Sequence, residues 1–142
     1  SYKIFAFVRN PYDRLYSCWK DKIRNQLAPD FAVYSVFRHE MPFEEFVRVV
    51  AEIPDQWSDG HFISQSHYLF YKNLQIPDFV GKFELLEQDW QKCQEYLGVQ
   101  FDKLPIRNKS EGFDWQFAYT SELKDLVYNR YHEDFKNFNY KK

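Results

Sequence analysis

A short apolar run that leads directly into a capped helix constrains the fold of this 142-residue chain more than any other feature. Residues 4–8 are all apolar, which suits a strand buried on both faces of a parallel sheet. Asn10 is a preferred N-cap residue, and Pro11 is favoured at the first helical position. Apolar side chains then recur at helical spacing, at Tyr12, Leu15, Tyr16, Trp19 and Ile23. The pattern predicts a strand, a tight turn and a helix that ends near residue 25.

The start of this helix predicts a site for an anion. The free N–H groups and the dipole of a helix N-terminus favour negative charge. Arg9 lies at the junction, and Arg14 and Ser17 follow on one helix face, because residues three and four apart are neighbours. A guanidinium group can bind phosphate through two parallel hydrogen bonds. We therefore expect these three side chains to bind a phosphate group; the alternative is an ordinary capped helix with a surface arginine.

The rest of the chain predicts further helices and one more clear strand. Residues 42–53 have a proline at the first position, acidic residues in the first turn and an apolar stripe, which together indicate a helix. Residues 78–84 predict a strand, and Gly81 within it indicates the close approach of another backbone. The helix behind this strand is expected to end at Gly98, which suits a helix C-terminus.

Residues 9–17, RNPYDRLYS, resemble the 3′-phosphate-binding motif R-(D/N)-P-x-x-R-L-x-S of sulfotransferases. The resemblance implies that Arg9 and Ser17 hold the 3′-phosphate of 3′-phosphoadenosine 5′-phosphosulfate, with Arg14 beside them. This donor passes its sulfuryl group in line to a hydroxyl group and leaves as adenosine 3′,5′-bisphosphate. Such a transfer depends on positioning and on stabilising charge at the leaving oxygen, and the resemblance implies no metal.

Three further segments resemble the carbohydrate branch of that family, which includes the heparan and chondroitin enzymes. They are residues 61–65 (HFISQ), 80–89 (VGKFELLEQD) and 134–140 (DFKNFNY). The resemblance implies an α/β fold of the P-loop-like sulfotransferase type, with a short parallel sheet flanked by helices. We expect residues 1–142 to form a single domain that is N-terminally incomplete and matches roughly the C-terminal two-thirds of the family domain. The reason is that the 5′-phosphosulfate loop of the family precedes the 3′-phosphate motif, and no later segment supplies one.

His61 has two interpretations beside the expected cleft. It can titrate near neutral pH and act as the catalytic base, or it can be a hydrogen-bonded residue that lines the cleft. In relatives whose base is known, the base lies upstream of the 3′-phosphate motif. His61 is therefore one candidate base, and a residue upstream of the motif is the alternative. Gln65 and His67 are weaker candidates. Because no Cys or acidic partner is placed to complete a metal site with His61 and His67, we expect no metal.

A basic loop precedes the last helix. Arg107, Lys109 and Ser110 lie close together within residues 101–110. In related enzymes a polar loop at this position closes over the nucleotide, so the resemblance implies that these three residues bind the donor. The alternative is a solvated basic loop. The final helix is expected over residues 121–135, with Ser121 as its cap.

The charge of the chain excludes one broad class of function. The 19 Lys and Arg residues and 21 Asp and Glu residues give a formal net charge of −2. A general nucleic-acid-binding protein carries a clustered basic excess, so no nucleic-acid partner is expected. The cysteines, Cys18 and Cys93, lack metal-ligand spacing and predict two buried free thiols rather than a disulfide. No stretch of this chain is long and apolar enough to be a membrane segment.

Two functions of different classes follow from these features. The first is a sulfotransferase that acts on a hydroxyl group of a carbohydrate or small-molecule acceptor. The second is a non-catalytic module of the same fold that binds a nucleotide, a phosphate or a protein partner. A homodimer is expected through the uncovered side of the first strand. The resemblance implies a Golgi location for an animal protein and a cytoplasmic one for a bacterial or viral protein.

Overall fold

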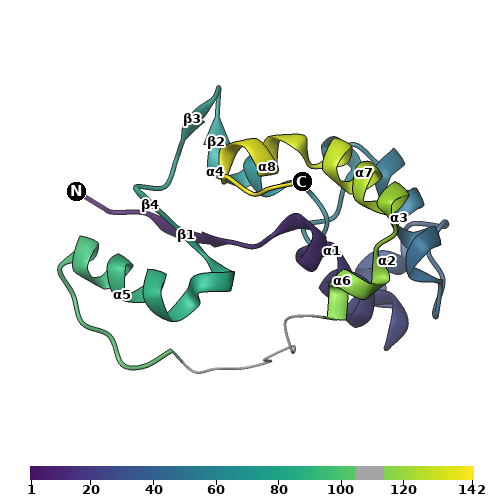
Figure 1. The fold of residues 1–142 in the computed structure, drawn as a ribbon, viewed down its shortest axis with the longest axis horizontal. Helices are drawn as coiled ribbons and strands as arrows, with labels where there is room; N and C mark the ends of the chain where they lie inside the picture. The colour runs from purple at the N-terminus through teal and green to yellow at the C-terminus, as the bar shows by residue number, and fades with distance from the viewer. Residues whose placement is uncertain (105–113) are drawn as a thin grey trace.

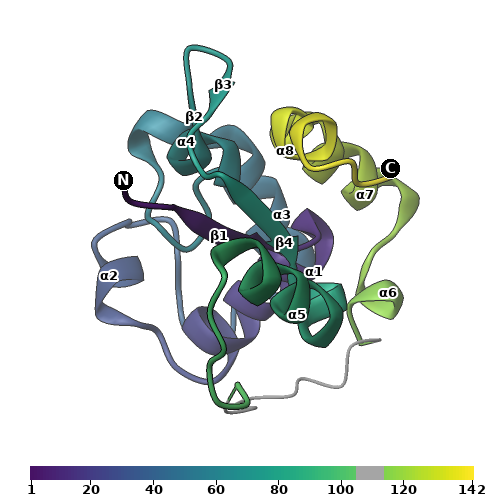
Figure 2. The same ribbon diagram turned by 90° about the vertical axis from the view of Figure 1, so that its left-hand side faces the viewer.

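Two parallel strands form the centre of the computed structural model, which describes residues 1–104 and 114–142. Strand β1 (Phe5–Val8) pairs with β4 (Phe79–Lys82) in parallel, and Val8 lies opposite Lys82. Helix α5 (Leu86–Leu97) lies on one side of this pair (Figures 1 and 2). Helix α1 (Pro11–Trp19) follows β1 and contacts α3 (Phe43–Glu52), α6 (Asp114–Ala118) and α7 (Ser121–Arg130). The predicted α/β fold with a short parallel sheet flanked by helices is confirmed.

The prediction that the first strand is buried on both faces is wrong. Phe5 is 42% exposed, and only Val8 at the end of the strand is fully buried. Helix α5 supplies the cover for the strand: the Trp90 ring lies 6.0 Å from the Phe5 ring and 6.3 Å from the Phe7 ring. Among the described residues no other strand pairs with β1 or β4, so the sheet is too narrow to enclose its first strand.

Gly81 allows the two strands to pack, but it lies against a side chain rather than against the backbone that the sequence predicted. It lies opposite Phe7 in the pairing of β1 with β4. A Cβ atom at Gly81 would lie 2.5 Å from Cε1 of the Phe7 ring, which no side chain tolerates without a shift. The missing side chain at this position therefore makes room for an aromatic ring.

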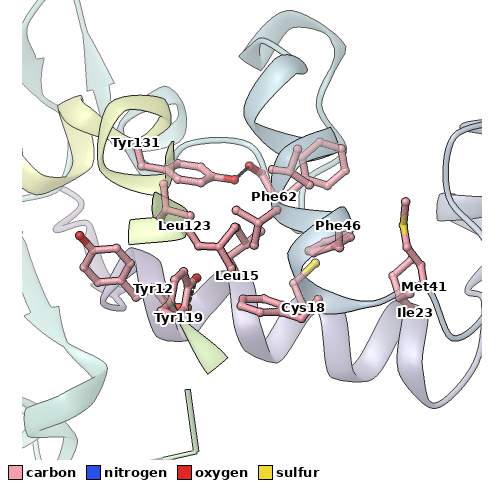
Figure 3. Close-up of a cluster of buried hydrophobic side chains, with 14 of the residues drawn as sticks. Tyr12, Leu15, Cys18, Ile23, Met41, Phe46, Phe62, Tyr119, Leu123 and Tyr131 are labelled. Carbon is pink, nitrogen blue, oxygen red and sulfur yellow. Dashed lines mark hydrogen bonds between the residues drawn. The ribbon is translucent and has the colours of Figure 1, made fainter. Parts of the chain in front are cut away.

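Helix α1 (Pro11–Trp19) begins as its sequence predicts. The Asn10 side chain accepts a hydrogen bond from the backbone N–H of Tyr12 at 3.0 Å, and Pro11 occupies the first helical position. The helix continues as a π-helical segment, Lys20–Arg24. Its apolar face, with Leu15 fully buried, forms the main core together with α3, α6 and α7 (Figure 3).

The last predicted helix is broken into two. Helix α7 (Ser121–Arg130) is capped by Thr120 rather than Ser121: the Thr120 side chain accepts from the N–H of Leu123 at 3.2 Å. Tyr131 then interrupts the helix with φ −108° and ψ 27°. Its buried hydroxyl donates to the carbonyl of Phe62 at 2.5 Å (Figure 3). In a continuous helix the Tyr131 side chain would point in another direction and would not make this bond.

The remaining elements are short and mostly helical. Both cysteines are free and buried, as predicted. Within the described residues no helix is long and apolar enough to cross a lipid bilayer. The other elements are α2 (Pro29–Ala32), α3 (Phe43–Glu52), α4 (Gln65–Leu69), β2 (Phe70–Tyr71), β3 (Leu74–Gln75), α6 (Asp114–Ala118) and α8 (His132–Asn137), with single 3-10 turns at Asp55–Trp57 and Phe83–Leu85.

Candidate functional site

A pocket of about 270 Å³ lies along one side of α1. It brings together four side chains that the sequence singled out: Arg9, Arg14, Ser17 and His61. Its lining also includes Cys18, Asp21, Lys22 and Gly60. The pocket therefore combines cationic side chains, a hydroxyl and an imidazole, which is the set that a phosphate group requires.

The N–H groups at the start of α1 are not an open anion site. The backbone N–H of Asn10 donates to Glu84 Oε1 at 2.5 Å, and the N–H of Tyr12 donates to the Asn10 side chain. The protein thus supplies its own oxygen atoms there, and the expectation that the helix N-terminus itself receives the anion is wrong. The side chains along the helix, rather than its backbone end, line the pocket.

The Arg9 side chain lies against a carboxylate and an aromatic ring. Its Nε lies 2.7 Å from Asp13 Oδ2, one helical turn on, and its guanidinium carbon lies 4.7 Å from the centre of the Phe83 ring. The Arg9 and Asp13 side chains are 20% and 13% exposed. This packing leaves the guanidinium at the pocket wall in a restricted orientation.

Arg14 fastens the loop that carries His61 to α1. Its Nη1 donates to the carbonyl of Ile63 at 2.5 Å, and its Nη2 donates to the carbonyl of Gly60 at 3.2 Å. The carboxylate of the neighbouring residue Asp13 pairs with Arg9 instead. Arg14 therefore shapes the pocket as well as lining it.

His61 sits beside two carboxylates. Its Nδ1 lies 2.6 Å from Asp59 Oδ1 and 3.6 Å from Asp30 Oδ2, so the expectation that it has no acidic partner is wrong. Burial alone would raise the pKa of Asp59, but hydrogen bonds from the backbone and ring of His61 outweigh it and hold that pKa below its usual value. The ligand atoms of the three residues lie within 4.8 Å of one another, and a hydrogen bond joins His61 to Asp59.

The comparisons with known proteins place the chain among the sulfotransferases. A family model described as "Sulfotransferase family" matches residues 1–141. The chain belongs to the sulfotransferase family.

Curated sulfotransferases match along nearly the whole chain. Carbohydrate sulfotransferase 10 from Homo sapiens is 27% identical over 170 aligned residues, which cover 100% of this chain and 48% of the relative. The Gallus gallus protein of the same name is 29% identical, with 96% and 46% covered. Carbohydrate sulfotransferase 11 from Mus musculus is 26% identical, with 99% and 47% covered. The chain thus spans about half the length of the curated relatives it matches. No solved structure matches it significantly.

Lys22 is a pocket residue that the sequence did not single out. It lines the pocket with Arg9 and Arg14, and its Nζ lies 3.8 Å from Asp30 Oδ2. It follows the pocket residue Cys18 by four positions, a spacing that places two side chains on one helix face. This four-residue spacing was the sequence signal that could have identified Lys22 as a pocket residue. Arg107, Lys109 and Ser110, the predicted loop residues, lie outside the described residues.

Cys18 lines the pocket as an inert thiol. It is 8% exposed, and burial raises its pKa to about 12, although Arg14 opposes this shift. A thiol with such a pKa carries almost no thiolate at neutral pH. Its contribution to the site is therefore its shape.

Proposed function

We propose that this chain is a sulfotransferase domain that binds 3′-phosphoadenosine 5′-phosphosulfate through the 3′-phosphate and transfers the sulfuryl group to a hydroxyl group. One observation carries the proposal: the motif residues Arg9, just before α1, and Arg14 and Ser17 within it line a single pocket. Lys22 adds a third cation to it. Two guanidinium groups, an ammonium group and a hydroxyl are suited to a dianionic phosphate.

The acceptor in this proposal is a carbohydrate. The support is that the curated relatives are named carbohydrate sulfotransferases, at 26–29% identity. A small-molecule acceptor remains the alternative for the same reaction. The Golgi or cytoplasmic location stays a prediction that depends on the source of the protein.

The donor supplies the sulfuryl group, and the described residues act on the opposite end of the nucleotide. Arg9, Lys22 and Ser17 anchor the 3′-phosphate and so fix the position of the bound donor. His61, the candidate base, lines this same pocket, so it can accept a proton only from an acceptor hydroxyl that reaches the pocket beside the 3′-phosphate. If its Nδ1 donates to Asp59, Nε2 is the unprotonated nitrogen and can take the proton of a hydroxyl group.

Calorimetry with two nucleotides tests the phosphate site. The full-length protein should bind adenosine 3′,5′-bisphosphate at least about tenfold more tightly than adenosine 5′-monophosphate, because a charge-assisted phosphate contact is worth about 1.5–3 kcal/mol. Arg9→Ala should remove most of this preference. Arg24→Ala is the matched control, since Arg24 follows α1 and lies against Trp19, outside the pocket.

Equal affinity of the wild-type protein for the two nucleotides would contradict the 3′-phosphate assignment. Transfer of labelled sulfate from the donor to a glycan separates the enzyme from the non-catalytic module. Selective binding without transfer by the full-length protein would favour the module. His61→Ala should lower kcat far more than it lowers nucleotide affinity if His61 is the base.

A further inference from the structure

The backbone of Arg9 is held by one side chain from another part of the fold. The N–H of Arg9 donates to Gln65 Oε1 at 2.8 Å, and Gln65 Nε2 donates to the Arg9 carbonyl at 2.8 Å. Both polar backbone groups of one residue are therefore satisfied by a single carboxamide, in the manner of a neighbouring strand. β1 ends at Val8, so this contact extends its pairing by one residue.

Gln65 is in turn fixed in place. It is the first residue of α4 and is only 9% exposed. The fully buried carboxylate of Asp134 accepts hydrogen bonds from the backbone N–H groups of Gln65 at 2.9 Å and of Ser66 at 2.7 Å. Asp134 belongs to α8, so the C-terminal helix holds the residue that holds Arg9.

A second side chain holds the next residue of the turn. Glu84 Oε1 accepts from the N–H of Asn10 at 2.5 Å, and Glu84 Oε2 accepts from the hydroxyl of Tyr140 at 2.7 Å. The Tyr140 oxygen also lies 3.4 Å from the carbonyl oxygen of Val8. The peptide groups on both sides of Arg9 are thus contacted by side chains from distant segments.

We propose that Gln65 and Glu84 are positioning residues that hold the Arg9–Asn10 backbone so that the Arg9 side chain lies at the pocket wall. The consequence of this positioning, which is recognition of the 3′-phosphate, rests on the proposed function. A long side chain amplifies small rotations of its backbone, so a turn that is free to rotate would displace the guanidinium group. Binding sites need their side chains held to within about 0.5 Å by such supporting contacts.

The inference assigns one physical task to three segments of the chain. Gln65 lies in residues 61–65, Glu84 in residues 80–89, and Asp134 and Tyr140 in residues 134–140. None of these four residues lines the pocket. Gln65 and Glu84 contact the backbone of the phosphate motif, and Asp134 and Tyr140 hold those two residues in place.

Two variants test the proposal in the full-length protein. Gln65→Met keeps the side-chain length and removes both hydrogen bonds to Arg9 without adding charge. Its control is Gln75→Ala, which removes a carboxamide that donates to the carbonyl of Pro77 at 2.8 Å in the remote β2–β3 hairpin. Glu84→Ala removes the acceptor for Asn10 from an exposed position, so this variant retains the fold; its control is the exposed neighbour Glu87→Ala.

Two measurements are made on each protein. Amide hydrogen exchange should become at least about tenfold faster at Arg9 in Gln65→Met and at Asn10 in Glu84→Ala, because each amide loses its acceptor. The preference for adenosine 3′,5′-bisphosphate over the 5′-monophosphate should fall about tenfold in both variants and remain unchanged in both controls. Removal of the Glu84 charge alone would strengthen anion binding, so a weaker preference in Glu84→Ala identifies positioning.

The outcomes separate this inference from the proposed function. Faster exchange with an unchanged nucleotide preference would overturn the positioning role. Unchanged exchange in both variants would overturn the hydrogen-bonded support itself, whatever the nucleotide result. A wild-type protein with no preference for the bisphosphate would overturn the proposed function, while the exchange measurement would still decide whether Gln65 and Glu84 hold the turn.

Discussion

Tyr12 carries a buried hydroxyl group that makes no hydrogen bond to the residues that the structure describes. The side chain is 2% exposed, and among the described residues its oxygen has no hydrogen-bond partner. Burial raises the pKa of this hydroxyl to about 12, with smaller contributions from Asp125 and Tyr128. The ring is well packed, since it lies 5.7 Å from the Trp115 ring in a stacked arrangement. The ring therefore stabilises the core while the hydroxyl opposes that stability.

We expect Tyr12→Phe to raise the free energy of unfolding by about 1 kcal/mol, because it removes a buried polar group without disturbing the ring. Tyr131→Phe is the matched control, since it deletes the bond to Phe62 and should lower that free energy by about 1 kcal/mol. Urea denaturation of both variants measures the two changes. A loss of stability in Tyr12→Phe would show that the hydroxyl has a partner.

Asp55 makes the stability of the protein depend on acid pH. Burial would raise the pKa of its carboxyl, but hydrogen bonds from Ser64 and Arg130 hold it below the ordinary value of 3.8. A lowered pKa in the folded state stabilises the fold above the unfolded pKa, and this contribution is lost as the pH falls through the folded value. Asp59 has a shift in the same direction.

We expect Asp55→Asn to lower the free energy of unfolding by about 2 kcal/mol at pH 7, because Arg130, whose side chain is 9% exposed, loses its ion pair. The difference from wild type should shrink as the pH falls below 3.8. Denaturation curves at several pH values measure it. A difference that is constant from pH 7 to pH 2 would contradict this account.

At the scale of the elements, the packing of β1 on β4 depends on one missing side chain. We expect Gly81→Ala to lower the free energy of unfolding by about 2 kcal/mol, because its Cβ would meet the Phe7 ring at 2.5 Å. That ring is confined by Trp90 and cannot easily move. Gly60→Ala should cost less, since its Cβ meets only the Tyr68 hydroxyl at 3.1 Å. Equal losses of unfolding free energy in Gly81→Ala and Gly60→Ala would show that the β1–β4 pair is not packed more tightly than the surroundings of Gly60.

The sequence predicted those elements whose signals are local. Asn10 and Pro11 begin α1 through contacts within one turn, and Gly98 ends α5 with φ 69°, a conformation that glycine adopts freely. The break at Tyr131 was missed because it follows from a bond to Phe62, 69 residues away. Local propensity contains no information about such a partner.

The same distinction applies to the site. Arg9, Arg14 and Ser17 could be predicted together because α1 and the turn before it carry them within nine residues. The approach of His61 could not be derived from spacing, because Arg14 holds its loop through backbone carbonyl groups, which every residue possesses. The support that Gln65 gives to Arg9 is also a side-chain contact with backbone, and it too leaves no pattern in the sequence.

At the scale of the whole molecule, apolar side chains remain exposed beside the first strand. Tyr2 is 99% exposed, Ile4 48% and Phe5 42%, and among the described residues β1 pairs along one edge alone. Open strand edges with apolar side chains favour association with another copy. The homodimer expected from the sequence stays a prediction on these grounds.

We expect light scattering at micromolar concentration to give the mass of a two-fold dimer for the 142-residue chain. The double variant Ile4→Lys, Phe5→Lys should shift it to the monomer, because a charged edge resists pairing. Val33→Lys is the control, since Val33 is 80% exposed and lies away from β1. A monomeric mass for the wild-type protein would contradict the prediction.

The contact of Tyr140 with Val8 spans 132 positions of the chain. A ribosome releases a chain from its N-terminus at about 5–20 residues per second, so Arg9 emerges on the order of ten seconds before Tyr140. During that interval α1 can form, but the side chains of Asp134 and Tyr140 are still in the exit tunnel or not yet joined. The supports of the Arg9–Asn10 turn are therefore complete only after Tyr140 has been added, and a product that stops short of α8 holds this turn through Gln65 and Glu84 without the contacts of Asp134 and Tyr140.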